Sequence, residues 1–144
     1  MATINKTLIG VHELVGGNDY VFSLPSASPN GQPLSGNLSS VVEEVYINCD
    51  ITLGGINILL PSIETFNRQW NTKIYVCLTA GLVGESATVT LYPFAGSEVP
   101  SIPADTLNGA SFIPFTGTYE TYYLHIVAPN MWMALNCPPP ALIV

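Results

Sequence analysis

Charged side chains are scarce in this sequence, and cations are almost absent. Only 9% of the 144 residues are charged, and ten acids against three bases give a net charge of −7. Three cations cannot neutralise a run of phosphates, which argues against direct nucleic-acid binding and against electrostatic docking on an anionic membrane. Because a small domain with so few charges tends to expose apolar surface, we expect this one to assemble with copies of itself or into a larger structure.

Long apolar runs and cysteine motifs are missing as well. No run approaches the length of a membrane-spanning helix, and the start, MATINKTLIGVHELVGG, lacks the continuous apolar core of a signal peptide. We therefore expect synthesis in a cytoplasm. Cys49, Cys77 and Cys137 form no C-x-x-C motif, and the strand-like surroundings of Cys49 and Cys77 favour buried free thiols over a disulfide or a metal site.

Motifs for catalysis do not occur either. The sequence has no G-x-S-x-G, no H-E-x-x-H and no phosphate-binding glycine loop, so we predict no enzyme and no catalytic, cofactor-binding or metal-binding residues. Two weaker alternatives stay open. One is a hydrolase that places His12 or His125 beside a carboxylate, and the other is a Ca²⁺ site that gathers Asp50, Asp105 and Glu120.

What the sequence does contain is two-residue alternation. In VYINCDITL the apolar side chains from Val45 to Leu53 fall on one face of an extended chain, and the residues between them fall on the other. The same period occurs in KIYVCLT, ATVTLY and TYYLHIVA, with shorter candidates in DYVFSL and MWMAL. Such segments, separated by Gly, Asn and Pro, are typical of half-buried strands. We predict an all-β, single-domain antiparallel β-sandwich of the jelly-roll type.

Two segments fall outside this strand pattern. Residues 25–40, PSASPNGQPLSGNLSS, carry no charge and predict an extended N-terminal arm or loop. Residues 136–144, NCPPPALIV, predict a stiff Pro-rich tail. We therefore divide the chain into an N-terminal part with an arm and strands (1–50), a β-sandwich (51–135) and the Pro-rich tail (136–144).

Aromatic side chains supply the candidate binding residues. The chain has seven Tyr and two Trp, and two of its three cations, Arg68 and Lys73, flank Trp70. We expect the ring of Trp70 to pack beneath its turn or against another subunit. The candidate residues for a subunit interface or a binding surface are Arg68, Trp70, Tyr119, Tyr122, Tyr123 and Trp132. Stacking of these rings on sugars is the alternative.

Residues 51–135 resemble a β-domain of tailed-bacteriophage virion surface proteins, which include head-fibre, capsid-decoration and tail-fibre proteins and those of crAss-like phages. The shared pattern runs from an I-x-L-P strand to a closing strand near N-x-W. Its parts are the strand at 58–61, an aromatic turn at 66–70, KIYV at 73–76, a glycine loop at 81–84, TVT at 88–90, the N-G turn at 108–109, and N-x-W at 130–132.

The resemblance implies a non-enzymatic virion structural protein. We expect a homotrimer on the virion surface, as a capsid-decoration or head-fibre subunit, assembled in the host bacterial cytoplasm. Its expected partners are its own copies and other virion proteins such as the major capsid protein, and residues 1–50 are the candidate anchor. The chain has no long shaft, which favours a compact trimer or knob over an extended fibre. The alternative function is a tail-tip or tail-fibre module that binds a receptor or glycan on the host surface.

Overall fold

The computed structural model describes residues 2–23, 42–64, 71–84 and 87–137, and the regular elements within these ranges are all β-strands. The strands are β1 (Ala2–Thr7), β2 (Val11–Val15), β3 (Asn18–Ser23), β4 (Val42–Asp50), β5 (Ile56–Leu59), β6 (Asn71–Ala80), β7 (Val89–Tyr92), β8 (Thr106–Leu107), β9 (Ile113–Pro114), β10 (Thr121–Ala128) and β11 (Met131–Cys137). The predicted all-β class is confirmed.

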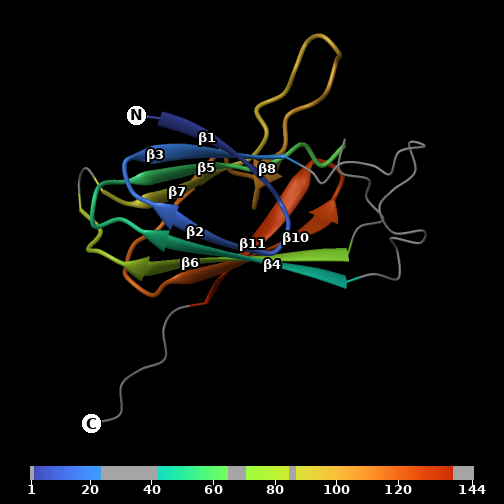
Figure 1. Cartoon of the computed structure of the whole chain (residues 1–144). Helices are drawn as coiled ribbons and strands as arrows, with labels where there is room; N and C mark the ends of the chain where they lie inside the picture. The colour runs from blue at the N-terminus through green and yellow to red at the C-terminus, as the bar shows by residue number, and fades with distance from the viewer. Residues whose placement is uncertain (1, 24–41, 65–70, 85–86, 138–144) are drawn as a thin grey trace.

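The strands form two sheets that pack face to face (Figure 1). One sheet has five strands in the order β1-β3-β5-β7-β9, and the other has six in the order β2-β4-β6-β10-β11-β8. From β1 to β7 the chain alternates between the sheets, so that each odd strand lies parallel to the previous odd strand and each even strand lies parallel to the previous even one. The first seven strands therefore wind as a flattened coil.

The predicted antiparallel arrangement is wrong for most of this sandwich. Antiparallel pairs occur where β9 joins β7, where β10 joins β6, and between β10 and β11, while β8 pairs parallel with β11. Alternation reports which face of a strand is buried and carries no information on the direction of its neighbour. Parallel strands are usually covered on both faces and read as continuous apolar runs. Here each sheet buries mainly one face, so most of its parallel strands keep the alternation that is typical of antiparallel sheets; in β7 the outward Thr90 is buried as well.

The alternation did predict the core correctly. Nine inward residues of β4, β6, β7 and β10 are fully buried between the sheets: Val45, Ile47, Cys49, Ile74, Val76, Leu78, Val89, Leu91 and Leu124. Each large side chain buried in this way stabilises the fold by about 1.5–3 kcal/mol. Leu53, which the pattern assigned to the same face, is 76% exposed because β4 ends at Asp50 and Leu53 lies in the turn that follows. Ile126, which the pattern assigned to the inward face of β10, is only half-buried.

Two corners of the coil touch at glycines. The backbone N–H of Gly16 donates to the carbonyl oxygen of Asp50 at 2.7 Å, and that of Gly17 donates to Gly55 at 2.8 Å. A Cβ atom at Gly16 would lie 2.1 Å from the carbonyl oxygen of Gly54, closer than any real side chain approaches. The turn after β2 and the turn after β4 therefore stack backbone against backbone.

The described part of residues 1–50 belongs to the same sandwich, because β1 to β4 contribute to both sheets. β1 is an edge strand of the five-stranded sheet, and β2 is an edge strand of the six-stranded sheet. The predicted arm or loop at 25–40 and tail residues 138–144 lie outside the described residues. Within the described ranges, no helix has the length and apolar character needed to cross a membrane.

Candidate functional site

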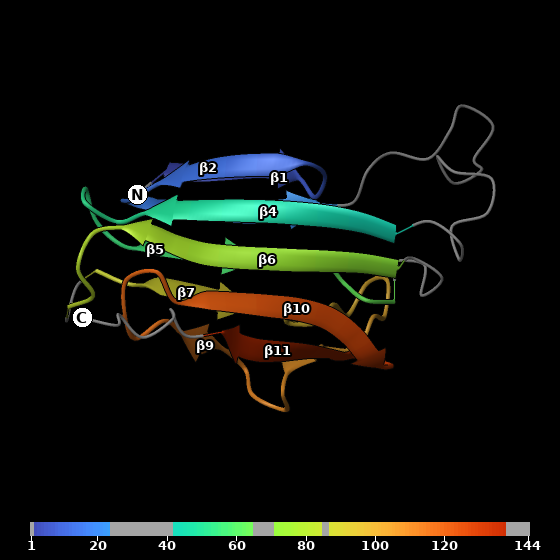
Figure 2. The same ribbon diagram turned by 90° about the horizontal axis from the view of Figure 1, so that it is seen from below.

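A row of five large side chains crosses the outer face of the six-stranded sheet. The strand register places Val11 of β2 opposite Tyr46 of β4 and Tyr46 opposite Tyr75 of β6. The row continues with Tyr75 opposite Tyr123 of β10 and Tyr123 opposite Leu135 of β11. Figure 2, seen from below, shows the strands that carry these residues side by side. We call Val11, Tyr46, Tyr75, Tyr123 and Leu135 the outer row.

The outer row is apolar surface that the single chain leaves in water. Val11 is 65% exposed, Tyr46 41% and Leu135 46%. Single exposed apolar side chains are normal on protein surfaces, whereas a contiguous set across several strands is typical of a surface that contacts another molecule.

The tyrosines of the outer row stack on one another. The ring centroids of Tyr46 and Tyr75 are 5.1 Å apart at an interplanar angle of 11°, and those of Tyr75 and Tyr123 are 5.1 Å apart at 18°. His125 continues the stack, with its ring 5.0 Å from that of Tyr123 at 24°. Neighbouring rings thus cover one another's faces and turn their edges outward. Such a surface suits flat packing against protein better than stacking on a sugar, which needs a free aromatic face.

Acidic side chains border the outer row on both sides. The hydroxyl of Tyr46 donates to Oε2 of Glu44 at 2.6 Å, and this hydrogen bond to a carboxylate raises the pKa of Tyr46. On the other side, the amide of Asn48 donates to Oε1 of Glu13 at 3.0 Å. Both carboxylates thus have hydrogen-bond partners within the chain, which lowers the cost of covering them with a second surface.

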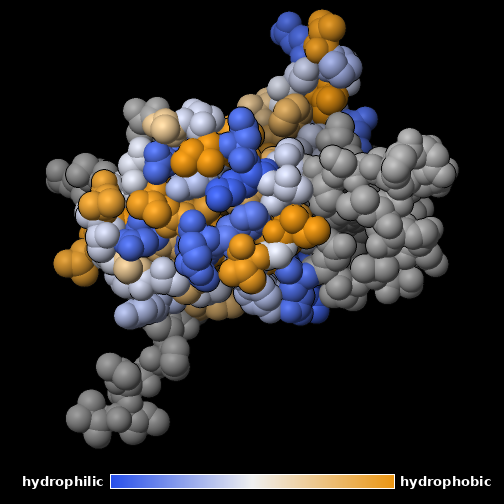
Figure 3. Space-filling view, in the orientation of Figure 1, coloured by the Kyte–Doolittle hydropathy of each residue, from blue (hydrophilic) through white to orange (hydrophobic). Residues whose placement is uncertain are grey.

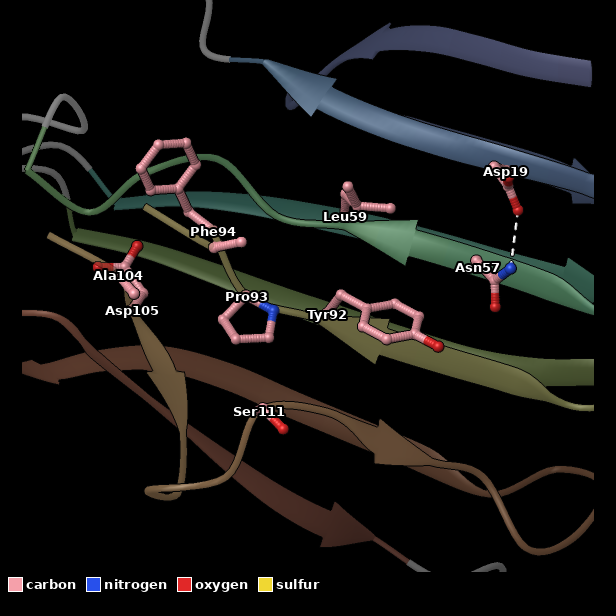
Figure 4. Close-up of a pocket in the computed structure, with 10 residues that line it drawn as sticks. Asp19, Asn57, Leu59, Tyr92, Pro93, Phe94, Ala104, Asp105 and Ser111 are labelled. Atoms are coloured by element: carbon pink, nitrogen blue, oxygen red, sulfur yellow. Dashed lines mark hydrogen bonds between the residues drawn. The ribbon is translucent and has the colours of Figure 1, made fainter. Parts of the chain in front are cut away.

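The opposite face of the sandwich carries a groove on the five-stranded sheet. Its wall is the segment between β7 and β8, which projects from the sandwich (Figure 1). One pocket of the groove has a volume of about 430 Å³, and its lining includes Asp19, Asn57, Tyr92 and Phe94 (Figure 4). A second pocket of about 480 Å³ shares Phe94 with the first and adjoins it.

One end of the groove is polar. The amide nitrogen of Asn57 donates to Oδ1 of Asp19 at 2.7 Å, the contact drawn as a dashed line in Figure 4. The two residues lie opposite each other on the parallel strands β3 and β5, and both are half-buried. The rest of the lining is mostly apolar, although it also includes Tyr92, Asp105 and Ser111.

A buried aspartate fixes the wall of the groove at its base. Asp105 is 3% exposed, and its two carboxylate oxygens accept hydrogen bonds from the backbone N–H of Ile63 at 2.8 Å and from the amide of Asn130 at 3.0 Å. The backbone N–H of Asp105 donates to the carbonyl oxygen of Phe94 at 2.9 Å. These bonds tie the projecting segment to two other parts of the chain.

Of the six aromatic and basic residues that the sequence indicated, the structure describes four, and these four do not lie together in one site. Tyr122 packs on Phe115 in the core with centroids 4.9 Å apart, and Trp132 is fully buried. Tyr119 is 63% exposed in the turn before β10, and Tyr123 lies in the outer row. Arg68 and Trp70 are outside the described residues. The interface role of these six residues stays a prediction.

Sequence reasoning missed Tyr46 and Tyr75 as site residues. Both were assigned correctly to the face opposite the core, and the signal that could have found them is a tyrosine at an outward position in each of three strands, in VYIN, IYVC and YYLH. Asp19 and Asn57 were missed because they are far apart in the sequence and meet only through the parallel pairing of β3 with β5.

The described histidines pack against aromatic rings, and the described acids form no metal-binding group. His12 packs edge-on against Phe22 at 5.1 Å, and His125 stacks on Tyr123. Among the described residues, no group of three or more His, Cys, Asp or Glu side chains could hold a metal ion. The carboxylate of Glu120 accepts hydrogen bonds from the backbone and hydroxyl of Thr116. Cys49 is buried, as predicted, whereas Cys77 is only half-buried.

Comparisons with known proteins give no relative from which a function could be transferred. No family model matches this chain, and no curated protein or solved structure matches it. The function therefore has to be inferred from the residues and the fold.

Proposed function

We propose that this protein is a non-enzymatic structural subunit of a bacteriophage virion, a capsid-decoration or head-fibre protein that assembles as a homotrimer. The observation that carries this proposal is the outer row, a band of apolar and aromatic side chains across five strands of one sheet. The resemblance of residues 51–135 to virion surface domains supports a bacteriophage virion as the assembly to which the protein belongs. The low content of charged residues, 9%, agrees with a chain that hides much of its surface in an assembly.

Three copies could each turn their six-stranded sheet toward a common threefold axis. The outer rows would then pack against one another and leave water, which is worth about 25 cal/mol for each Å² of apolar surface removed. Lys73 lies opposite Glu44 in the strand register, so the border of this surface is not uniformly acidic despite the net charge of −7. Repulsion between copies is reduced where the two charges lie together.

The attachment to other virion proteins, such as the major capsid protein, is assigned to the N-terminal part. Its strands β1 and β2 are sheet edges. An edge strand presents backbone N–H and C=O groups that can pair with a strand of another protein. This supports residues 1–50 as the anchor. Edge pairing uses the backbone of β2, so the outward side chain of Val11 stays available to the outer row for the contacts between copies.

A tail-tip or tail-fibre module that binds a host receptor or glycan is the second candidate function. The outer row does not favour it, because the tyrosine faces are covered by their neighbours. The groove on the opposite sheet does favour it, because Asp19 and Asn57 supply hydrogen-bonding groups beside an apolar lining.

The test of the proposed function is to locate the chain in the virion. Particles of the phage that encodes it would be purified, searched for its peptides by mass spectrometry, and labelled with a specific antibody for electron microscopy. We expect the peptides in purified particles and the label on the capsid. A label confined to the tail would favour the second candidate, and particles free of the chain would contradict both.

A further inference from the structure

We infer that the groove on the five-stranded sheet binds a neutral saccharide, with one sugar ring in the pocket beside Asp19 and Asn57. The inference rests on the second candidate function, to which it gives a site and a class of ligand, and it does not depend on the trimer. The pocket volume of about 430 Å³ is in the range of small-molecule sites, about 300–1,000 Å³.

The polar groups of the pocket match the hydroxyl groups of a sugar. The bond from the Asn57 amide to Asp19 holds both side chains in place. It turns the carbonyl oxygen of Asn57 away from Asp19, and the hydroxyl of Tyr92 points toward the same end of the pocket (Figure 4). A carboxylate, an amide and a phenol together accept and donate hydrogen bonds over a small area, as neighbouring sugar hydroxyls require.

The apolar lining matches the other side of a sugar ring. Leu59, Tyr92, Pro93 and Phe94 line the pocket next to the polar pair (Figure 4). A pyranose ring has an apolar C–H face and a polar rim, so it can cover this surface while its hydroxyls reach Asp19 and Asn57. Pockets that combine apolar walls with a few placed polar groups are typical of small-molecule binding.

The charge of the pocket lining favours neutral sugars over anionic ones. The described residues that line this pocket include the carboxylates of Asp19 and Asp105 and contain no Lys or Arg. An anionic ligand would meet two like charges there, in a chain with a net charge of −7. Sialylated, phosphorylated or sulfated sugars are therefore disfavoured.

The adjoining pocket extends the site. It has a volume of about 480 Å³, and its lining runs from Val21 and Ser23 on β3 to Ile102 of the wall. Because the two pockets meet at Phe94, the groove can accept consecutive rings of an oligosaccharide more readily than a single sugar.

Native affinity electrophoresis tests the inference on the full chain. Gels would contain dextran, mannan or galactan as neutral probes, with dextran sulfate as the anionic counterpart. The groove variants are Asp19→Asn, which keeps the side-chain shape and removes the charge, and Tyr92→Ala. Glu64→Gln is the matched control, since it removes one exposed carboxylate that does not line either pocket. Thermal melting and light scattering on each variant check its fold and oligomeric state.

We expect at least one neutral polysaccharide to retard the wild-type protein and Glu64→Gln equally. Asp19→Asn should weaken this binding about tenfold or more, the usual effect of losing a hydrogen bond to a charged group, and Tyr92→Ala should weaken it as well. Absence of retardation by all three neutral probes would overturn the inference, as would stronger retardation by dextran sulfate or equal retardation of folded groove variants. If the protein is a trimer and binds no saccharide, the saccharide inference is contradicted and the assembly proposal is unaffected. If the protein is a monomer and binds a neutral polysaccharide, the saccharide inference is supported and the homotrimer proposal is contradicted.

Discussion

At Gly16 the missing side chain lets two corners of the coil meet. The Cβ of any other residue would lie 2.1 Å from the carbonyl oxygen of Gly54, which belongs to the backbone and cannot turn aside as a flexible side chain would. One position thus sets how closely the turn after β2 can approach the turn after β4, and with it the pairing of β2 with β4.

Replacing Gly16 by alanine should therefore destabilise the fold by about 1–3 kcal/mol, the usual cost of overpacking. Gly117→Ala is the matched control, because nothing lies within 4 Å of a Cβ placed there. Urea unfolding followed by circular dichroism would measure both. Equal midpoints for the two variants would contradict the close contact.

Cys49 and Cys137 should differ sharply in reactivity. Burial raises the pKa of the Cys49 thiol, so this residue stays protonated at neutral pH, whereas Cys137 is exposed. Because the thiolate is the reactive form, we expect a disulfide reagent to modify Cys137 quickly and Cys49 only after unfolding in urea. A Cys77→Ser/Cys137→Ser variant leaves Cys49 as the single thiol, because Cys77 is a half-buried free cysteine. Rapid modification of Cys49 in that folded variant would contradict its burial.

The raised pKa of the Cys49 thiol also predicts how the stability of the fold depends on pH. The folded chain holds the Cys49 proton to higher pH than the unfolded chain does, so the stability linked to this group is complete below the ordinary thiol pKa of about 8.5 and is lost progressively above it. The stability difference between wild type and Cys49→Ala should therefore shrink from pH 7 to pH 9.5, as measured by urea unfolding. A constant difference would contradict the assignment.

Among the structural elements, the wall of the groove depends on Asp105. Replacing it by alanine leaves the N–H of Ile63 and the amide of Asn130 without their acceptor, and an unsatisfied buried group costs about 1–3 kcal/mol. We expect a loss of that size in stability and faster hydrogen exchange at the Ile63 amide. Ser101→Ala, an exposed change in the same segment, should alter neither. Unchanged protection of Ile63 in Asp105→Ala would show that the wall is held in another way.

The strands show what could be predicted from the sequence and what could not. Alternation identified β4, β6, β7 and β10 and the face that each buries, because burial acts on every second residue of a strand. It did not identify β1, whose residues are half-buried or exposed throughout. Strand direction was predicted wrongly, because pairing is a contact between segments distant in the sequence, and a period of two is the same for parallel and antiparallel neighbours.

The same limit applies to the two candidate sites. Tyr123 was predicted as a surface residue, but the outer row exists only because β4, β6 and β10 align their tyrosines in register. Likewise, Asp19 and Asn57 form a pair only through the pairing of β3 with β5. A single sequence gives the outward position of each side chain and does not give the register that brings them together.

At the scale of the whole molecule, the sandwich has two different outer faces. The six-stranded sheet presents stacked tyrosines between exposed Val11 and Leu135, and the five-stranded sheet presents the groove and its wall. Hydrophobic residues also appear between hydrophilic ones on the side of the molecule shown in Figure 3. A chain with few charges and two such faces can use one for assembly and keep the other accessible.

The most direct test of assembly through the outer row is the mass of the particle in solution. Light scattering coupled to size exclusion would compare wild type with Tyr75→Ser/Tyr123→Ser, which removes two outward rings, and with Leu82→Ser, which changes a side chain that is 86% exposed outside the row. We predict three times the chain mass of 15.4 kDa for wild type and Leu82→Ser, and a folded monomer for the double variant. A wild-type monomer at micromolar concentration, or a trimer that survives loss of both tyrosines, would contradict assembly through this face.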